Sequence, residues 1–376
     1  MEKTRKYKTK NRKLFLQRRA RKLHLRHVKW KEHRRNERRI RCEINYRRNR
    51  SLRKQVIHEY ERNRFKNYSR RNAPENFSII GNHEQVINFC NNLRDDYRRR
   101  RKVFVNLERV NKITNESLGL LVSNMMLFQQ QKIDFNGNFP IDERSKAIVI
   151  KSGFLEQLYK GKRNSVNNVG SSIYTHAAAT SNAEVVGAII ESCSRFLWQE
   201  SYYYDGVYNA IVELMLNTFE HANEIEGKQK WWLTVTKDEE NSKCTFSFLD
   251  YGRGIITTLQ DAQHKHHSTI VDKILSKFGS FTNRDAILLQ EVLEGALVIS
   301  EKDSAQYGNG LHSIYRDMVD NLLDNVIIIT NNVYADLKNG LYQTMKVRFN
   351  GTFISMEINK NTTHGDLCSN SIYPDA

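Results

Sequence analysis

The chain has few residues that interrupt secondary structure and no long apolar run. It contains only 3 prolines in 376 residues, and residues 1–71 hold neither proline nor glycine. No apolar stretch approaches the roughly 20 residues that a membrane-spanning helix requires. The N-terminal residues also lack the apolar core of a signal peptide. We therefore expect a cytoplasmic protein without a membrane partner.

Cysteine is scarce as well. The five cysteines lie far apart, at Cys42, Cys90, Cys193, Cys244 and Cys368. Their number is odd and their spacing matches no metal-ligand pattern. We expect reduced structural thiols, as is usual in the cytosol.

Acidic residues are scarce at one end of the chain only. The net charge is +18, and residues 1–71 hold 29 Lys and Arg against 6 Asp and Glu, whereas the remainder holds 31 basic and 36 acidic residues. All of the excess positive charge therefore belongs to an N-terminal arm, residues 1–71. Arg and Lys favour helix, but apolar residues are too few for a core. We expect a helical or flexible arm without a fold of its own.

This arm has the composition of a nucleic-acid-binding segment. Guanidinium groups at such density suit phosphate, and Trp30, Tyr46 and Tyr60 are available to stack on bases. We expect binding mainly through phosphate contacts, without distinguishing RNA from DNA. A solubilising tail and a helix docked on an acidic partner are the alternatives.

A small α/β domain is expected at residues 75–162. The breaker Asn72-Ala73-Pro74 marks its start. Strand-like and helix-like runs then alternate, which favours this fold class. They are strands at 103–107 and 135–140 and helices at 117–130 and 145–150.

Residues 103–121, V-F-V-N-L-E-R-V-N-K-I-T-N-E-S-L-G-L-L, resemble the STAS domains of anti-anti-sigma factors. In that family a strand leads to a loop with a phosphorylatable serine and then to a helix. The matching position here is Glu116, with Ser117 where the family usually has glycine. The resemblance implies a fixed surface for a protein partner rather than a phosphorylation switch; an unrelated small α/β module is the alternative.

The rest of the chain divides into a polar linker, a larger domain and a tail. Residues 163–182 are rich in Asn, Ser and Gly and predict the linker, 183–360 the domain, and 361–376 a polar tail. The domain would begin with a helix at 183–199 and continue with strands at 231–237 and 243–250. Three further strands are expected at 325–330, 341–349 and 352–358, with hairpin turns at Asn339-Gly340 and Asn350-Gly351.

The first of three motifs is the stretch E-L-M-L-N-T-F-E-H-A at residues 213–222. Glu213, Asn217 and His221 recur every four residues, so on a helix they share one face. The residues between them are apolar and would face a core. A carboxylate one turn from a carboxamide can hold a metal ion and orient a water; an amphipathic helix with incidental polar residues is the alternative.

Two later motifs contain glycine. Asp250, Gly252 and Gly254 come at the end of a strand, and this pattern suits a backbone that passes close to a flat ligand. A buried carboxylate at Asp250 could accept a hydrogen bond from an exocyclic amine of that ligand. Residues 307–311, Y-G-N-G-L, open a helix whose N-terminus could receive phosphate. Taken singly, a plain turn and a simple helix cap explain them equally well.

In this order the three motifs resemble the GHKL (Bergerat-fold, histidine-kinase-like) ATPases over about residues 183–360, and residues 351–358 are similar to the closing strand of that family. The resemblance implies an α/β sandwich that binds ATP and Mg²⁺. Asn217 would bind Mg²⁺, Glu213 would be the general base, and Asp250 would bind the adenine amine beside Gly252 and Gly254. Gly308, Asn309, Gly310 and Leu311 would line the phosphate end, with His221 in a less defined role.

Residues 255–307 lie between the two glycine motifs, where that family has its ATP lid. Helix-like runs are expected at 270–278 and 285–297. His264, His266 and His267 invite a metal site, but with Lys265 between them and no nearby thiol we expect a solvated loop.

Two classes of function remain open. The chain would be either an ATP-dependent conformational switch, which closes or dimerises on ATP, or a serine/threonine kinase of the anti-sigma type. An ATP-gated scaffold without turnover is a variant of the first. The basic arm favours the switch with nucleic acid as partner, because such a kinase has no evident need for that charge. Overall we expect an α/β (α+β) protein.

Overall fold

The computed structural model describes residues 19, 21–39, 64–154, 173–177, 183–199, 204–221, 230–266, 283–295 and 309–362. The chain divides into two compact units, Met1–Asn67 and Tyr68–Ala376. The second unit already includes a strand at Ser69–Asn72. The last residues of the expected arm therefore belong to the folded body. The described residues form no helix that is long and apolar enough to cross a bilayer.

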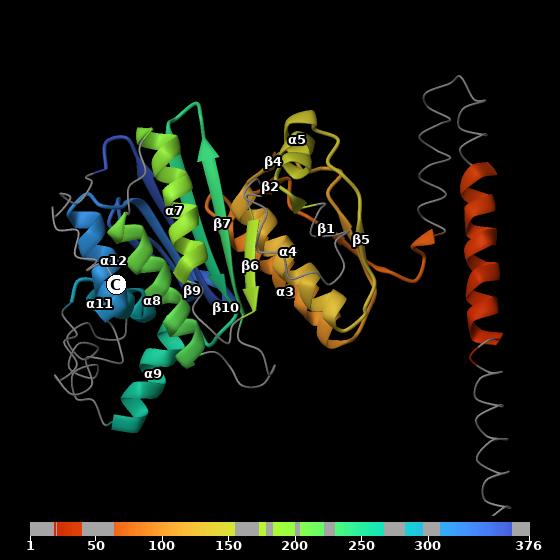
Figure 1. Cartoon of the computed structure of the whole chain (residues 1–376). Coiled ribbons are helices and arrows are strands. Elements are labelled where there is room, and N and C mark those ends of the chain that lie inside the picture. Colours follow the sequence, from red (N-terminus) through yellow and green to blue (C-terminus); the bar gives the residue numbers. More distant parts are fainter. Residues whose placement is uncertain are drawn as a thin grey trace, which may run out of the picture. The chain divides into compact units, whose positions relative to one another are not determined.

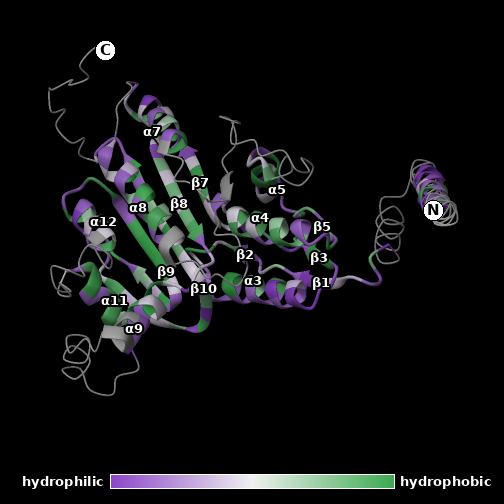
Figure 2. Ribbon diagram, turned by 60° about the horizontal axis from the view of Figure 1, so that its bottom comes forward, coloured by the Kyte–Doolittle hydropathy of each residue, from purple (hydrophilic) through white to green (hydrophobic). Residues whose placement is uncertain are grey.

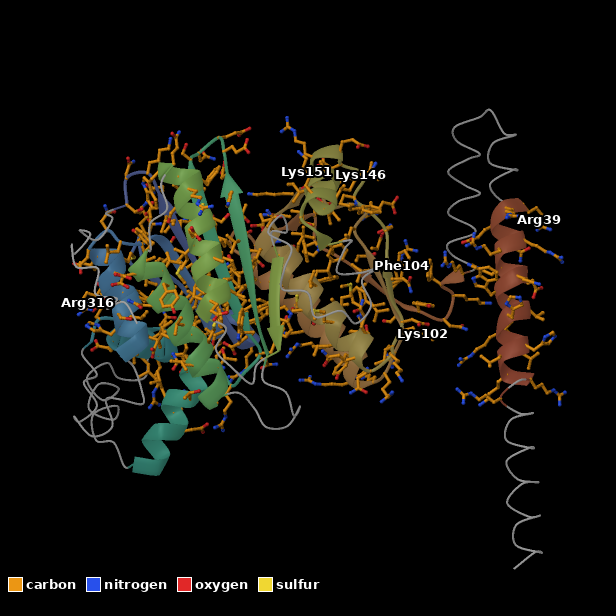
Figure 3. All side chains as sticks on the ribbon, viewed as in Figure 1. Arg39, Lys102, Phe104, Lys146, Lys151 and Arg316 are labelled. Atoms are coloured by element: carbon orange, nitrogen blue, oxygen red, sulfur yellow. The ribbon has the colours of Figure 1, made fainter. Side chains whose placement is uncertain are left out.

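In the first unit, residues 21–39 are helical and almost entirely exposed. They carry nine Lys and Arg against two Glu. Basic side chains extend from the helix in several directions, with Arg39 close to one end (Figure 3). The same helix is hydrophilic along most of its length (Figure 2). This confirms a helical segment in the arm and shows that its charges face solvent.

Residues 68–154 form a coil of similar turns, which we call the repeat module (Figure 1). A full turn consists of a strand, a second short strand and a helix. Strands β1, β3 and β5 pair in parallel and in that order, and β2 pairs in parallel with β4. The elements are β1 (Ser69–Asn72), β2 (Asn76–Phe77), α3 (His83–Arg98), β3 (Val103–Asn106), β4 (Lys112–Ile113), α4 (Asn115–Gln130), β5 (Phe135–Gly137) and α5 (Glu143–Lys151).

Asparagine side chains connect successive turns of this coil. Asn106 Nδ2 donates to Asn72 Oδ1 at 2.9 Å, and Asn138 Nδ2 donates to Asn106 Oδ1 at 2.6 Å. Asn138 Oδ1 in turn accepts from the backbone N–H of Leu107 at 2.7 Å. The three asparagines are separated by 34 and 32 residues. This internal repeat was not predicted from the sequence.

Residues 173–362 form the sheet module, a five-stranded antiparallel sheet with helices (Figure 1). The strand order is β6-β7-β8-β10-β9. The strands are β6 (Ile173–Ala177), β7 (Lys230–Asp238), β8 (Lys243–Asp250), β9 (Asp324–Asp336) and β10 (Leu341–Asn359). The helices are α7 (Ala183–Trp198), α8 (Asp205–His221), α9 (Ile255–His266), α11 (Arg284–Leu293) and α12 (Asn309–Val319). Strand β6 lies within the segment expected to be a linker.

The Asn339-Gly340 turn is confirmed, because Leu341 pairs with Asp336 across it and Gly340 has φ +62°. The prediction of a hairpin at Asn350-Gly351 is wrong. β10 runs through these residues as one strand, with a register shift against β9 between Phe349 and Thr352. A glycine with positive φ bends this strand without reversing it, a use that dipeptide composition does not distinguish from a turn.

The antiparallel sheet is covered on both faces. Alternate side chains of a strand point to opposite faces. Trp231 and Phe248 pack with α7, α8, α9, α11 and α12. Trp232, Leu249 and Phe353 pack instead with α3 and α4 of the repeat module. The two modules therefore share one core.

Helix α4 of the repeat module lies close against β7 of the sheet module. A Cβ added to Gly119 would collide with the Thr234 hydroxyl on β7. Asn115 Nδ2 donates to Thr236 Oγ1 at 3.2 Å, also on β7. Glu116 and Ser117 lie at the same end of α4, and Ser117 is fully buried and accepts from the Ile79 N–H at 2.8 Å. The helix start that was expected to meet a separate protein thus lies beside β7 of its own chain.

Candidate functional site

Helix α8 presents Glu213 and Asn217 on one face. Ile211, Leu214 and Met215 are spaced to bury one side of the helix in the core. Glu213 and Asn217 lie one turn apart and are half-buried. His221 ends the helix, and its side chain lies outside the described residues. The predicted shared face of Glu213 and Asn217 is confirmed. The expectation that the apolar residues between the polar positions all face the core is wrong for Leu216, which is 44% exposed.

The N-terminus of α12 meets α8 at Glu213. Gly310 is the second residue of α12, and a Cβ placed on it would lie 2.5 Å from Glu213 Oε1 and 2.6 Å from Cδ. Only glycine permits this approach. Leu311 packs into the core with 9% exposure, Asn309 starts the helix, and Gly308 lies outside the described residues. Glu213 of the first motif and Gly310 of the third, 97 residues apart in the sequence, are thus in contact.

Asp250 ends β8 and is a buried carboxylate with 8% exposure. Burial raises the pKa of Asp250 to about 6, although hydrogen bonds from Gly252 and Thr352 and the charge of Arg94 oppose this rise. The Gly252 N–H donates to Asp250 Oδ1 at 2.6 Å. This carboxyl is therefore held in place by local hydrogen bonds and is easily protonated.

Gly254 accommodates a side chain from β9. Its φ is +79°, and a Cβ there would lie 2.5 Å from Asn331 Oδ1. Asn331 is fully buried, accepts from the N–H of Ile256 at 3.0 Å and donates to the Arg253 carbonyl at 2.8 Å. The asparagine thereby caps the N-terminus of α9. Sequence reasoning missed it; two asparagines inside the apolar run 326–335 were the available signal.

Gly351 and Thr352 hold the other side of Asp250. Thr352 pairs with Asp250 across the strands β10 and β8 and hydrogen-bonds to it. Gly351 has φ +140°, and a Cβ there would lie 2.9 Å from the Cα of Tyr251. The resemblance covered these residues only as a closing strand, and their contact with Asp250 was not predicted.

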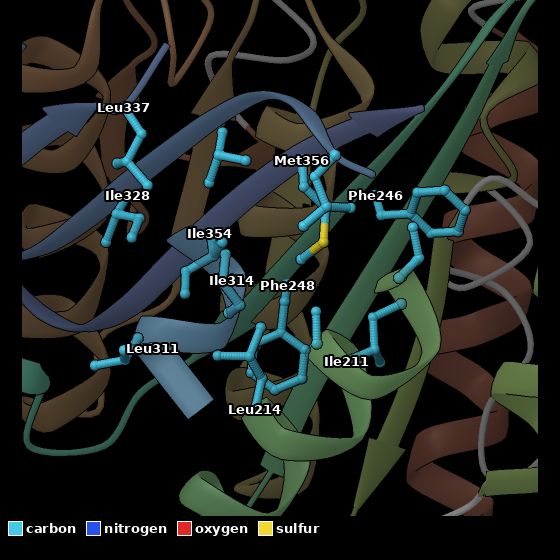
Figure 4. Packing of buried hydrophobic residues seen from close by; sticks show 14 of the residues in the cluster. Ile211, Leu214, Phe246, Phe248, Leu311, Ile314, Ile328, Leu337, Ile354 and Met356 are labelled. Atoms are coloured by element: carbon cyan, nitrogen blue, oxygen red, sulfur yellow. The ribbon is translucent and has the colours of Figure 1, made fainter. Parts of the chain in front are cut away.

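The three motifs border one hydrophobic cluster (Figure 4). Leu214 next to Glu213, Phe248 two residues before Asp250, and Leu311 next to Gly310 all belong to it. Glu213 and Gly310 are brought into direct contact, whereas the hydrogen bonds of Asp250 lie within its own loop and with β10. The arrangement combines a buried acceptor, a carboxylate and a carboxamide on one helix, and a glycine at a helix N-terminus.

The segment between the glycine motifs contains α9 and α11. The expected helix at 285–297 corresponds to α11, and the expected helix at 270–278 lies outside the described residues. The prediction of a loop at His264 and His266 is wrong, because both belong to the last turn of α9. His267 lies outside the described residues. Within the part of the chain that the structure describes, no group of three His, Cys, Asp or Glu could hold a metal ion.

Comparison with known proteins gives no relative. A scan against models of protein families, a search of curated proteins and a search of solved structures each found no match.

Proposed function

We propose that the chain binds ATP and Mg²⁺ between α8, the β8–α9 loop and the start of α12, and acts as a GHKL-type nucleotide-dependent switch. The contact of Glu213 with Gly310 carries this proposal. It joins two motifs that are distant in the sequence, at a point where a helix begins, and helix N-termini attract phosphate.

Asp250 supports recognition of the adenine base. A carboxylate accepts hydrogen bonds only, and the exocyclic amine of adenine is a donor. The side chain is buried and fixed by Gly252 and Thr352, so it is oriented before the ligand arrives. Recognition in a buried position also discriminates strongly against a base that lacks the donor.

Gly310 and Asn217 support binding of the phosphates and the metal. Gly310 has no side chain of its own, so the first turn of α12 can lie directly against the Glu213 side chain, beside Asn217 on α8. Mg²⁺ at phosphate sites keeps several waters and takes few protein ligands besides the phosphate oxygens. The Asn217 carboxamide oxygen would be such a ligand. When bound, ATP supplies a γ-phosphoryl group whose presence or loss can order a lid.

Glu213 would orient a water or accept its proton. Its carboxylate lies at the α8–α12 contact, one turn from Asn217. A general base must lie within hydrogen-bond reach of its proton in the bound complex. This position supports an ATPase more directly than an ATP-binding scaffold.

The arm helix supports a nucleic-acid partner. Trp30 is 53% exposed and lies in a small stack with His27 at 5.9 Å, while the Arg34 guanidinium lies 5.1 Å from its ring centre. An exposed indole among cations can stack on a base while its neighbours contact phosphate. We propose that nucleic acid binds this helix.

Asn217→Ala tests the site. We expect Mg²⁺-dependent ATP binding to fall at least about tenfold, since a lost charge-assisted contact is worth roughly 1.5–3 kcal/mol. Binding is measured by calorimetry with and without Mg²⁺, and ATP turnover is measured on the same samples with and without nucleic acid.

Asn209→Ala is the matched control, because Asn209 is exposed on the same helix. Equal ATP affinity of the two variants would reject the site. Tight binding by the wild type without any turnover would instead assign an ATP-gated scaffold or a kinase that needs its substrate.

A further inference from the structure

Tyr251 connects the loop of Asp250 to the repeat module. Side chains alternate along β8. Phe248 and Asp250 face the helices of the sheet module, whereas Leu249 and Tyr251 face α3 and α4 of the repeat module. The Tyr251 ring meets Trp232 edge-on at 5.4 Å and lies 5.9 Å from Phe349. Tyr251, which lies between Asp250 and Gly252 in the proposed adenine-binding loop, is thus held in the shared core of the two modules.

The Tyr251 hydroxyl is fixed by two fully buried residues of α4. It lies 2.7 Å from Ser123 Oγ and accepts from Asn124 Nδ2 at 3.0 Å. Ser123 gives its one proton to the Leu120 carbonyl at 2.7 Å, so the tyrosine hydroxyl donates to Ser123. Burial raises the pKa of Tyr251 to about 12, and the hydroxyl therefore keeps its proton at neutral pH.

Arg94 of α3 covers the ring of Tyr251. Its guanidinium carbon lies 3.5 Å from the ring centre. Its Nε and Nη2 atoms are buried and have no hydrogen-bond partner among the described residues. The ring is therefore a main contact of this cation, and α3 and α4 both hold the same tyrosine.

The backbone connects Tyr251 to Asp250. The hydrogen bond from the Gly252 N–H to Asp250 Oδ1 closes a turn around Tyr251. Gly351 of β10 lies so close to the Tyr251 Cα that a Cβ on it would collide. A displacement of the tyrosine cannot be absorbed by this short turn, so it moves the carboxyl.

We propose that Tyr251 is a positioning residue that couples the repeat module to the adenine-binding carboxyl, through its contacts with Ser123, Asn124 and Arg94. The inference rests on the proposed function, because it assigns Asp250 to the base. By linkage, a ligand that requires the present position of Asp250 also stabilises the present packing of α3 and α4, and a partner that shifts these helices weakens nucleotide binding.

The experiment compares Tyr251→Phe, Ser123→Ala and Tyr334→Phe with the wild type. Tyr251→Phe keeps the ring and removes the hydroxyl. Ser123→Ala leaves Tyr251 intact and removes the α4 hydroxyl to which it donates. Tyr334→Phe is the control, because this buried tyrosine stacks on His83 at 4.4 Å in the same shared core but away from the loop. The affinities for ADP and GDP are measured on each folded protein.

We expect Tyr251→Phe and Ser123→Ala each to weaken ADP binding by about three- to tenfold, the usual value of one buried hydrogen bond. GDP binding should change little, so the preference for adenine falls. The double variant should lose no more than Tyr251→Phe, because both changes break the same contact.

Tyr334→Phe should keep the wild-type preference. A preference that is unchanged in Tyr251→Phe and Ser123→Ala, with the wild type binding ADP, would overturn the coupling and leave the proposed function intact. A wild type that binds neither nucleotide would overturn the proposed function and the coupling together. A merely structural role would lower stability without changing the preference.

Discussion

Asp250 is the residue in which stability and ligand binding oppose each other. A buried carboxyl whose pKa is raised to about 6 is favoured by the fold while protonated. Its ordinary pKa is 3.8, so between these values the folded state binds more protons than the unfolded state. The free energy of unfolding therefore falls as pH rises from about 4 to about 6 through this group.

Asp250→Asn should remove this pH dependence. At about 1.4 kcal/mol per pKa unit, the variant should gain up to about 3 kcal/mol over the wild type between pH 4 and pH 7. ATP binding should fall in the same variant, because the ligand needs a pure acceptor. Urea unfolding at both pH values measures the first effect, and calorimetry measures the second.

Asp238→Asn is the control, with the opposite sign. Hydrogen bonds from Asn241 hold the pKa of Asp238 below its usual value, so this carboxylate stabilises the fold at high pH and loses its contribution as pH falls. A pH-independent difference between wild type and Asp250→Asn would contradict the burial argument.

Some residues of the candidate site can be predicted from the sequence and others cannot. Glu213 and Asn217 follow helical spacing, and Leu214 and Met215 between them belong to the core, as expected. Asn331 and Thr352 act through contacts with strands or loops that are distant in the sequence, so no local pattern reveals them. Tyr251 is next to Asp250 in the sequence but faces the repeat module. This position depends on which face of β8 each module covers.

At the scale of elements, α8 and α12 are packed closely where they meet in the candidate site. Gly310 is close to the Glu213 side chain, so an added methyl group must displace either the carboxylate or the helix. The two helices and the core beneath them then shift together.

Gly310→Ala should weaken ATP binding and destabilise the fold by about 1–3 kcal/mol, the usual cost of overpacking. Gly187→Ala on α7 is the matched change, because a Cβ there meets nothing within 4 Å. It should stabilise the fold by about 0.5–1 kcal/mol, since alanine favours helix over glycine. Thermal unfolding and ATP titration of both variants decide the matter, and equal behaviour would refute a tight junction.

Helices α4, α5, α7 and α11 and the hairpin of β7 and β8 were predicted within a few residues. Helix α3 was missed, although Val86, Ile87, Cys90 and Leu93 follow helical spacing. The short strands β1, β2 and β4 were missed, since two to four residues carry no periodicity and their pairing partners lie about one turn of the coil away. Strand β10 was divided in two, because its bend at Gly351 has the composition of a turn.

At the scale of the whole molecule, charge and fold are separated. The excess positive charge lies in residues 1–71, while the folded unit starts at Tyr68. A deletion that tests the arm must therefore end before β1, whose Arg71 forms an ion pair with the buried Asp96 at 2.6 Å.

Removal of residues 1–67 should abolish salt-sensitive binding to nucleic acid and leave ATP binding unchanged. For the full-length protein, the logarithm of the binding constant should fall linearly with the logarithm of salt concentration, with a slope of about −0.9 per phosphate neutralised on a duplex. Fluorescence anisotropy between 50 and 300 mM salt measures both proteins. Retention of this binding by the shortened protein would place the nucleic-acid surface elsewhere.

The sequence indicated two domains joined by a linker and gave no sign of how they pack. The packing of α4 against β7 depends on Gly119 and Thr234, which are unremarkable residues individually. Docking of this kind is decided by the shape of two surfaces, and hydrophobic periodicity identifies only that each surface is apolar.

The burial of α4 also affects the synthesis of the chain. Eleven of its 16 residues are buried, partly by β7, which begins 100 residues after α4 ends. At about 5–20 residues per second, a ribosome needs roughly 5–20 s to make the intervening chain. During that time an apolar helix has left the ribosome before its covering strand exists. The separation of 100 residues from the end of α4 to the start of β7 therefore sets the time for which the apolar surface of α4 waits for the strand that covers it.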